Sequence, residues 1–331
     1  MAIPLLAVVA VGGGVVGAAV VDDARTTMNR AKEINREAQR KANAATTKHD
    51  KTLKSTNDTL ADLGKTKISI MASSMNDFVE TYKRIRNVDF NDKVGHEELR
   101  NFNEDFRELQ KASFNAVELA KGGVGSIAAG ALTAAGAYGA VGALATASTG
   151  TAISALSGAA ATNATLAWLG GGAIAAGGGG MAVGTMVLGG LVAAPALIIT
   201  GLFMSSKAEE ALNEAKSQLD EAKKYKQNVK NLCTVMEAIS ARANQIDNLL
   251  TALNGKFRPV INQLATLINN RGTDFYNYSA REQDFVHLAA SLAKTIKIVI
   301  DTSLIREDGS LRDNETQKAL ASGQKMLNAI N

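Results

Sequence analysis

Apolar residues recur at spacings of three and four over most of the chain, which is the pattern of helices that bury one face. The longest such pattern covers residues 207–254, where the period is close to 3.5 residues, as in a coiled coil. Its members are Leu212, Ala215, Leu219, Ala222, Tyr225, Val229, Leu232, Met236, Ile239, Ala243, Ile246, Leu250 and Leu253. We expect this helix to end at Asn254-Gly255 and a further apolar face to begin at Phe257–Ile268.

Residues 22–121 are predicted to form three helices. The first has an alanine-rich seam that allows long helices to pack closely, and Gly64 marks an expected break after it. The second and third carry larger side chains, and Asn87–Gly95 connects them. The three apolar faces are Ala24, Met28, Ala31, Ala38, Ala42, Ala45, Leu53, Leu60 and Leu63; Met71, Met75, Phe78, Tyr82 and Ile85; and Leu99, Phe102, Phe106, Leu109, Val117 and Ala120.

The C-terminal part is predicted to contain one more amphipathic helix over residues 282–300. The turn dipeptide Asp308-Gly309 then predicts a short hairpin within residues 300–311, followed by a last helix. No other period-2 pattern of any length is present, and only three prolines interrupt the chain. The fold class expected is all-α, an elongated bundle of long amphipathic or coiled-coil helices with a central glycine-rich hydrophobic membrane hairpin.

Two segments contain no charged residue, 1–21 and 122–206. The near-continuous apolar run Ile3–Val21 is about as long as the roughly 20 residues that cross a bilayer core, so we expect a membrane-seeking helix. A cleaved signal peptide is the alternative, since Gly17-Ala18-Ala19 suits a cleavage site. However, nothing basic precedes Leu5, as a signal peptide usually requires.

The central segment 122–206 holds two thirds of the 30 glycines of the chain. A flexible linker is one interpretation, but a linker has no need of the large apolar side chains spread through it. In lipid every backbone polar group must be satisfied internally, so the membrane interpretation predicts helices, best over Met181–Met204 and less clearly over Val124–Ala145. The candidate membrane-insertion residues are Ile127, Leu132, Leu144, Trp168, Leu169, Met181, Met186, Leu188, Leu191, Leu197, Ile198, Ile199 and Phe203.

Small residues recur at four-residue spacing in the same segment, a pattern that lets membrane helices approach closely. The candidate helix-packing pairs are Gly125 with Ala129, Gly136 with Ala140, and Gly180 with Gly184. Between the two predicted spans, Thr146–Asn163 is expected to form a turn on the far side or a third short helix.

All charge lies in residues 22–121 and 207–331, and the net charge is only +4. This balance argues against a nucleic-acid-binding domain, so no nucleic-acid partner is expected. Basic residues flank both uncharged segments, and basic residues tend to stay on the cytoplasmic side of a membrane. We therefore expect residues 22–121 and 207–331 to lie on that side. These flanking residues are Arg25, Arg30, Lys32, Arg36, Arg40, Lys41, Lys111, Lys121, Lys207 and Lys216.

No pattern predicts an enzyme, a cofactor or a metal site. Gly64-Lys65-Thr66 resembles the end of a phosphate loop, but Thr59 occupies the position of the first glycine. Gly170, Gly172 and Ala175 fit a relaxed dinucleotide fingerprint without the strand that must precede it. His49, His96 and His287 are far apart in sequence, and the single Cys233 lies among apolar residues, where it is expected to be buried.

The order of an apolar N-terminus, charged helices, an uncharged centre and more charged helices resembles the plan of α-helical pore-forming toxins of the cytolysin A and haemolysin BL type. The resemblance covers most of the chain as architecture, without a diagnostic motif. It implies a membrane head at 122–206 and a membrane-active helix at 3–21. The chain departs from that plan in its much longer, glycine-rich head and in lacking a clear export signal, which favours an intracellular membrane effector.

We therefore predict four regions: an apolar helix at 1–21, a charged helical half at 22–121, a membrane hairpin at 122–206, and a coiled-coil helix with C-terminal helices at 207–331. The expected function is oligomerisation and permeabilisation of a lipid bilayer, entered from a soluble cytoplasmic form. One alternative is a permanently anchored scaffold that shapes the bilayer or recruits a protein partner through 207–254. Others are a soluble bundle with a buried glycine-rich core or oligomer interface, and a tether between two coiled-coil arms.

Overall fold

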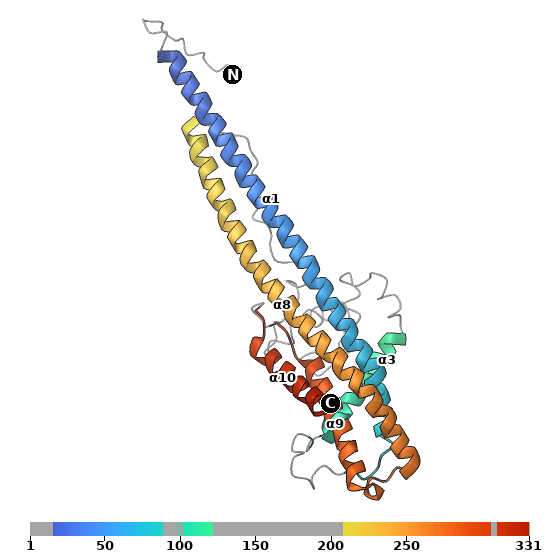
Figure 1. The fold of residues 1–331 in the computed structure, drawn as a ribbon. Helices are drawn as coiled ribbons and strands as arrows, with labels where there is room; N and C mark the ends of the chain where they lie inside the picture. Colours follow the sequence, from blue (N-terminus) through green and yellow to red (C-terminus); the bar gives the residue numbers. More distant parts are fainter. Residues whose placement is uncertain (1–15, 89–98, 100–101, 122–207, 306–309, 331) are drawn as a thin grey trace. The chain divides into compact units, whose positions relative to one another are not determined.

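The computed structural model describes residues 16–88, 99, 102–121, 208–305 and 310–330 (Figure 1). Helix α1 (Val16–Ile70) continues through a π-helical turn, η1 (Met71–Met75), into α2 (Asn76–Tyr82). The remaining elements are α3 (Phe102–Lys121), α8 (Ala208–Arg271), the 3-10 turn η5 (Phe275–Asn277), α9 (Ala280–Asp301) and α10 (Asp313–Ile330). The all-α prediction is confirmed, since the only β contacts among these residues are two isolated bridges.

The chain forms two compact units, to each of which α1 and α8 contribute. Unit 1 comprises residues 1–51 and 192–234. Unit 2 comprises residues 52–191 and 235–331, and it includes α2, α3, α9 and α10. Since two long helices each supply part of both units, the units are defined by packing and not by continuous stretches of sequence.

In unit 1, α1 and α8 run parallel to each other. Ala31 of α1 packs with Ala211 and Ala215 of α8. Further along both helices, Ala42 and Ala45 pack with Tyr225, Val229 and Cys233. Residue numbers rise together on the two helices, in blue and yellow in Figure 1, so their N-termini lie at the same end of the unit.

In unit 2 the two helices are also parallel, and their seam carries larger side chains. Thr56 donates a hydrogen bond to the Met236 carbonyl oxygen over 3.3 Å, and Arg258 donates from Nε to Ser74 Oγ over 3.2 Å. The largest fully buried side chains all belong to this unit: Phe78, Phe102, Phe257, Met75, Leu99, Leu109, Ile246, Leu250, Leu253, Leu264 and Ile268. A shared apolar core therefore joins α1, α2, α3, α8, α9 and α10.

The expected break at Gly64 is wrong, because α1 runs through it to Ile70. A glycine inside a helix costs about 0.5–1 kcal/mol relative to alanine. The neighbouring Leu63, Ile68 and Ile70 are buried, and each such side chain contributes about 1.5–3 kcal/mol when removed from water. Packing of this face therefore outweighs the local preference of one glycine.

The expected end at Asn254-Gly255 is also wrong, because α8 continues through Pro259 to Arg271. Proline removes one helical hydrogen bond, whose acceptor would be the carbonyl four residues earlier, at Gly255. Gly255 and Pro259 are both exposed, so water can bind that carbonyl, while Leu253 and Phe257 are fully buried. Packing of the buried face thus keeps α8 continuous, although one backbone hydrogen bond is missing on its exposed face.

The C-terminal predictions fit the structure more closely. Helix α9 begins with a complete capping box between Ser279 and Glu282 and covers the predicted helix at 282–300. The predicted hairpin corresponds to one antiparallel bridge, between Ile305 and Leu311. Within the residues that the structure describes, no helix combines the length and the apolar character needed to cross a membrane.

Candidate functional site

The predicted membrane segment lies outside the described residues, and so do all its candidate insertion and packing residues, from Gly125 to Phe203. The structure instead describes the helices to which the uncharged segments are attached. Segment 122–206 follows α3, which ends at Lys121, and precedes α8, which begins at Ala208. Of the predicted N-terminal helix, residues 3–15 also lie outside the described residues, and residues 16–21 form the start of α1.

The parallel packing in unit 1 brings two of these attachment points to one end. Ala211 lies near the start of α8 and packs with Ala31, which lies fifteen positions after the start of α1. At 1.5 Å per residue, α1 extends about 15 Å past the start of α8. The apolar N-terminal segment and the uncharged central segment therefore both join unit 1 at this end, which we call the attachment end.

The seam at the attachment end is made of small side chains. Its fully buried members in α1 and α8 include Ala31, Ala38, Ala211, Ala215 and Ala222. Alanine buries little apolar surface, and the stabilisation from burial is roughly 25 cal/mol per Å². The short side chains allow close approach of the helices but contribute little free energy.

Two polar atoms weaken the same seam further. The Oδ1 atom of Asn35 and the Oε1 atom of Gln218 are buried without a hydrogen-bond partner. A buried polar group without a partner costs about 1–3 kcal/mol. One hydrogen bond offsets this, between Thr46 Oγ1 and the Tyr225 hydroxyl over 3.1 Å. Sequence reasoning identified the alanine seam but not these polar positions, which follow the same spacing.

The other attachment, through α3, has a different character. Helix α3 packs on η1 and α2, and its first turns join an aromatic cluster made of Phe78, Tyr82, Phe102 and Phe106, with ring centroids 5.0–6.4 Å apart. An ion pair between Lys294 Nζ of α9 and Asp105 Oδ2 of α3 spans 2.6 Å. The start of α3 is thus firmly held in unit 2.

Two titratable groups in unit 2 have shifted pKa values. Burial lowers the pKa of Lys67 to about 8, an effect that the nearby Asp301 carboxylate opposes. The Lys67 ammonium donates to the Ile300 carbonyl oxygen over 2.7 Å, at the C-terminus of α9, where a cation is favoured. Burial raises the pKa of Tyr82, whose hydroxyl has no hydrogen-bond partner. Both groups are explained by packing, and neither has a reacting partner beside it.

The described residues hold no group of three or more His, Cys, Asp or Glu side chains placed to bind a metal. His49 lies in unit 1, His287 is buried in unit 2 with its ring 5.6 Å from Phe275, and His96 lies outside the described residues. Cys233 is fully buried, as predicted. Gly64-Lys65-Thr66 lies within α1 and not in a loop.

A hollow of about 580 Å³ lies between α8 and α10. Amide and aliphatic side chains line it, without a charged or nucleophilic group: Gln245, Asn248, Leu249, Ala252, Leu320, Ala321, Gln324 and Leu327. Such a lining offers hydrogen bonds but no acid, base or nucleophile for a reaction.

Comparison of the chain with protein-family models, with curated proteins and with solved structures gives no match.

Proposed function

We propose that this protein inserts helices into a lipid bilayer, oligomerises and permeabilises the membrane. Segments 1–21 and 122–206 are the membrane-active parts, and the charged helices form the body that carries them. The resemblance to α-helical pore-forming toxins agrees with this arrangement.

The observation that carries the proposal is the parallel packing of α1 and α8 in unit 1. The contacts of Ala31 with Ala211 and Ala215 bring the attachment points of both charge-free segments to one end. Antiparallel packing would separate the two points by the length of the pair. Segments that enter a bilayer together must approach it from one side, and the attachment end meets this requirement.

The weak seam of the attachment end supports the same proposal. Insertion requires the two segments to move from a covered position into lipid, and regions that move are drawn from the least stable parts of a protein. The alanine contacts and the unpartnered Asn35 and Gln218 atoms make this end easier to open than unit 2. Apolar side chains of residues 122–206 would then gain a hydrocarbon environment.

The test is dye release from liposomes by the full chain and by a variant with a charge in the best predicted span. Leu191→Lys lies near the middle of Met181–Met204, where a charge opposes insertion by about 2.5–3.5 kcal/mol. We expect its dye release to fall at least about tenfold. Ala238→Lys places the same charge at an exposed position of α8 and should release dye like the unmodified chain.

Chemical cross-linking on the liposomes should yield oligomers from the full chain and fewer from Leu191→Lys. Equal dye release from both lysine variants and from a chain whose residues 122–206 are replaced by a Gly/Ser linker of the same length would contradict the proposal. Circular dichroism of each variant checks that the helices remain folded.

A second candidate, a permanently anchored scaffold, is favoured by the aromatic cluster that holds α3. Phe102 and Phe106 pack on Phe78 and Tyr82, so the helix that leads into segment 122–206 is firmly fixed at its start. A helix that is held in unit 2 in this way suits an anchor that does not rearrange. Vesicle binding that resists carbonate extraction, without release of dye, would select this function.

A further inference from the structure

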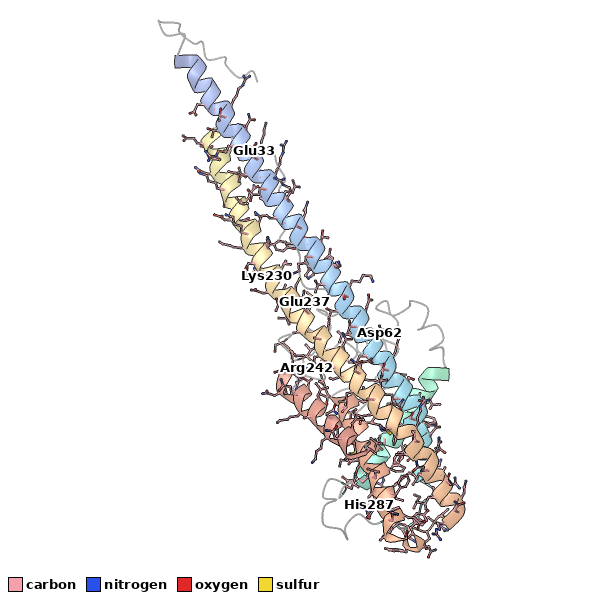
Figure 2. All side chains as sticks on the ribbon, in the orientation of Figure 1. Glu33, Asp62, Lys230, Glu237, Arg242 and His287 are labelled. Atoms are coloured by element: carbon pink, nitrogen blue, oxygen red, sulfur yellow. The ribbon has the colours of Figure 1, made fainter. Side chains whose placement is uncertain are left out.

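Four basic residues form a stripe along α1 in unit 1. Arg25, Lys32, Arg36 and Arg40 are separated by seven, four and four residues, so they share one face of the helix. All four side chains are exposed, while the seam residues Ala31 and Ala38 are fully buried. Figure 2 shows side chains projecting from this part of α1, near the labelled Glu33. We call these four residues the basic stripe.

Within the basic stripe, the Nε atom of Arg40 donates a hydrogen bond to the Arg36 carbonyl oxygen over 3.4 Å, but the charges of the stripe repel one another. Like charges four residues apart, as in Lys32 with Arg36 and Arg36 with Arg40, destabilise a helix by about 0.2–0.5 kcal/mol per pair. Among the residues that the structure describes, no carboxylate forms an ion pair with any of the four. The nearby Glu37 pairs instead with Lys41, over 3.1 Å. An anionic partner outside the described residues would account for the arrangement.

The position of the stripe identifies the chemistry of that partner. It begins four residues after Val21, the last residue of the charge-free N-terminal segment, and lies on the same continuous helix. Asp22 and Asp23 follow this segment, and residues 24–41 then carry six basic and two acidic side chains. An apolar segment followed by such a basic stretch matches a bilayer, whose hydrocarbon lies beneath anionic headgroups. A nucleic-acid duplex would have no use for the apolar segment.

The length of the stripe sets the geometry of docking. Fifteen residues of helix separate Arg25 from Arg40, which is about 22 Å at 1.5 Å per residue. The field of an anionic surface decays within about 8 Å at physiological ionic strength. In an upright helix only the residues nearest the membrane would therefore feel the surface, whereas a helix lying along it would use all four.

We propose that Arg25, Lys32, Arg36 and Arg40 bind anionic lipid headgroups and lay the first part of α1 along the membrane surface. This inference rests on the proposed membrane function and adds its lipid class and its docking geometry. Docking side-on brings the attachment end, with both charge-free segments, into contact with the bilayer before insertion.

The test measures binding of the full chain to vesicles of phosphatidylcholine with and without phosphatidylserine. Each basic residue near an anionic surface contributes about fivefold in binding. The triple variant Lys32→Gln, Arg36→Gln, Arg40→Gln should therefore bind phosphatidylserine vesicles about a hundredfold more weakly. The matched control replaces Lys223, Lys224 and Lys226 by Gln. It removes the same charge from exposed positions of α8 in the same unit, and its binding should fall by no more than about fivefold.

Single variants test the geometry. Side-on docking predicts that Arg25→Gln and Arg40→Gln weaken binding equally, whereas upright docking predicts an effect of Arg25→Gln alone. Circular dichroism and thermal unfolding confirm that the variants fold. Equal binding by the triple variant and its control would overturn the proposal, and so would tight binding of the unmodified chain to duplex DNA or RNA without binding to vesicles.

The two proposals fail in different ways. If the triple variant binds normally while Leu191→Lys still abolishes dye release, the docking surface is wrong and the membrane function stands. If Leu191→Lys releases dye normally while the triple variant loses binding, the docking surface stands and permeabilisation through 122–206 is wrong.

Discussion

Units 1 and 2 share α1 and α8 but differ in the side chains that fill the seam between these two helices. In unit 1 the fully buried positions are mostly alanine, such as Ala38 and Ala222. In unit 2 they are large, such as Phe78, Leu253 and Phe257, and α3, α9 and α10 add to the same core. Full burial of a large apolar side chain contributes about 1.5–3 kcal/mol, several times the contribution of a methyl group.

This difference indicates that stability is concentrated in unit 2. The local free energy of opening varies across a protein, and regions with few buried apolar contacts lie at its low end. The attachment end belongs to unit 1, where a change of conformation needs least energy. The difference is consistent with the proposed function, in which one unit stays folded while the other responds to a membrane.

The largest expected effect comes from truncating the core of unit 2. Phe257 is fully buried, with its ring centroid 5.4 Å from that of Phe78. We expect Phe257→Ala to lower the free energy of unfolding by about 3–5 kcal/mol in urea titrations.

Two buried valines, one in each unit, provide a matched comparison. Val299→Ala in unit 2 should cost about 2 kcal/mol and Val229→Ala in unit 1 clearly less. Equal costs for the two valines would contradict the difference between the units.

Hydrogen exchange compares the units within single helices. Amides of residues 23–51 in α1 should exchange on the order of a hundredfold faster than those of residues 52–82, because opening of unit 1 breaks fewer apolar contacts. Residues 208–234 and 235–271 of α8 should differ in the same way. Uniform protection along both helices would show that they open as one cooperative body.

The pH dependence of stability tests the packing of unit 2. The pKa of Lys67 is about 8 in the folded state against an ordinary value of 10.5, so between these values the unfolded chain binds a proton that the folded chain has released. Stability should therefore rise with pH above about 8, by roughly 1–3 kcal/mol. Tyr82 acts in the opposite direction, since its pKa is raised above 10.0 and the unfolded chain loses its proton first. We expect a maximum slightly above pH 10, between the ordinary values of 10.0 for Tyr82 and 10.5 for Lys67, where the two effects cancel.

Denaturant titrations from about pH 7 to about pH 11 measure this dependence. Lys67→Met should remove the rise, and Tyr82→Phe should remove the fall above pH 10, while the exposed Lys54→Met should leave both in place. A rise that persists in Lys67→Met would show that another group is responsible.

The smallest expected effects concern two glycines. A Cβ atom at Gly323 of α10 would lie 2.6 Å from Cδ2 of Leu249 in α8, so Gly323→Val should destabilise the protein by about 1–3 kcal/mol. Nothing lies within 4 Å of a Cβ atom at Gly64 in α1, so Gly64→Ala should stabilise it by about 0.5–1 kcal/mol. Thermal unfolding of the two variants measures whether each change in stability has the expected sign. A stabilising Gly323→Val would mean that α8 and α10 are not in close contact there.

Several buried faces follow directly from residue spacing. All five members of the face predicted over 67–86, Met71, Met75, Phe78, Tyr82 and Ile85, are buried. Most of the face predicted over 207–254 is buried as well, while Leu212, Leu219, Leu232 and Met236 remain half-buried. Three of these four lie in unit 1, where only one helix packs against α8 among the described residues and a narrow seam leaves its flanks in water.

The errors at Gly64 and Asn254-Gly255 have one cause. Local signals for a helix end are worth about 1 kcal/mol, and they decide the outcome only where no partner helix packs on the segment. The partner segment is distant in sequence, so its contribution is not visible in a local pattern. The same reason explains why Asn35 and Gln218 were not recognised as buried polar positions.

The sequence by itself determined the helical class, most of the buried positions and the absence of charge in 1–21 and 122–206, because these depend on spacing and composition. Ala24, predicted on the first apolar face, is exposed. Only the tertiary structure decided that α1 and α8 are parallel, with Ala31 beside Ala211 and Ala215. The apolar face of each helix, considered by itself, is compatible with either parallel or antiparallel packing. The direction is selected by the sum of all contacts along the pair and by the connections between them, and these exist only in the folded chain.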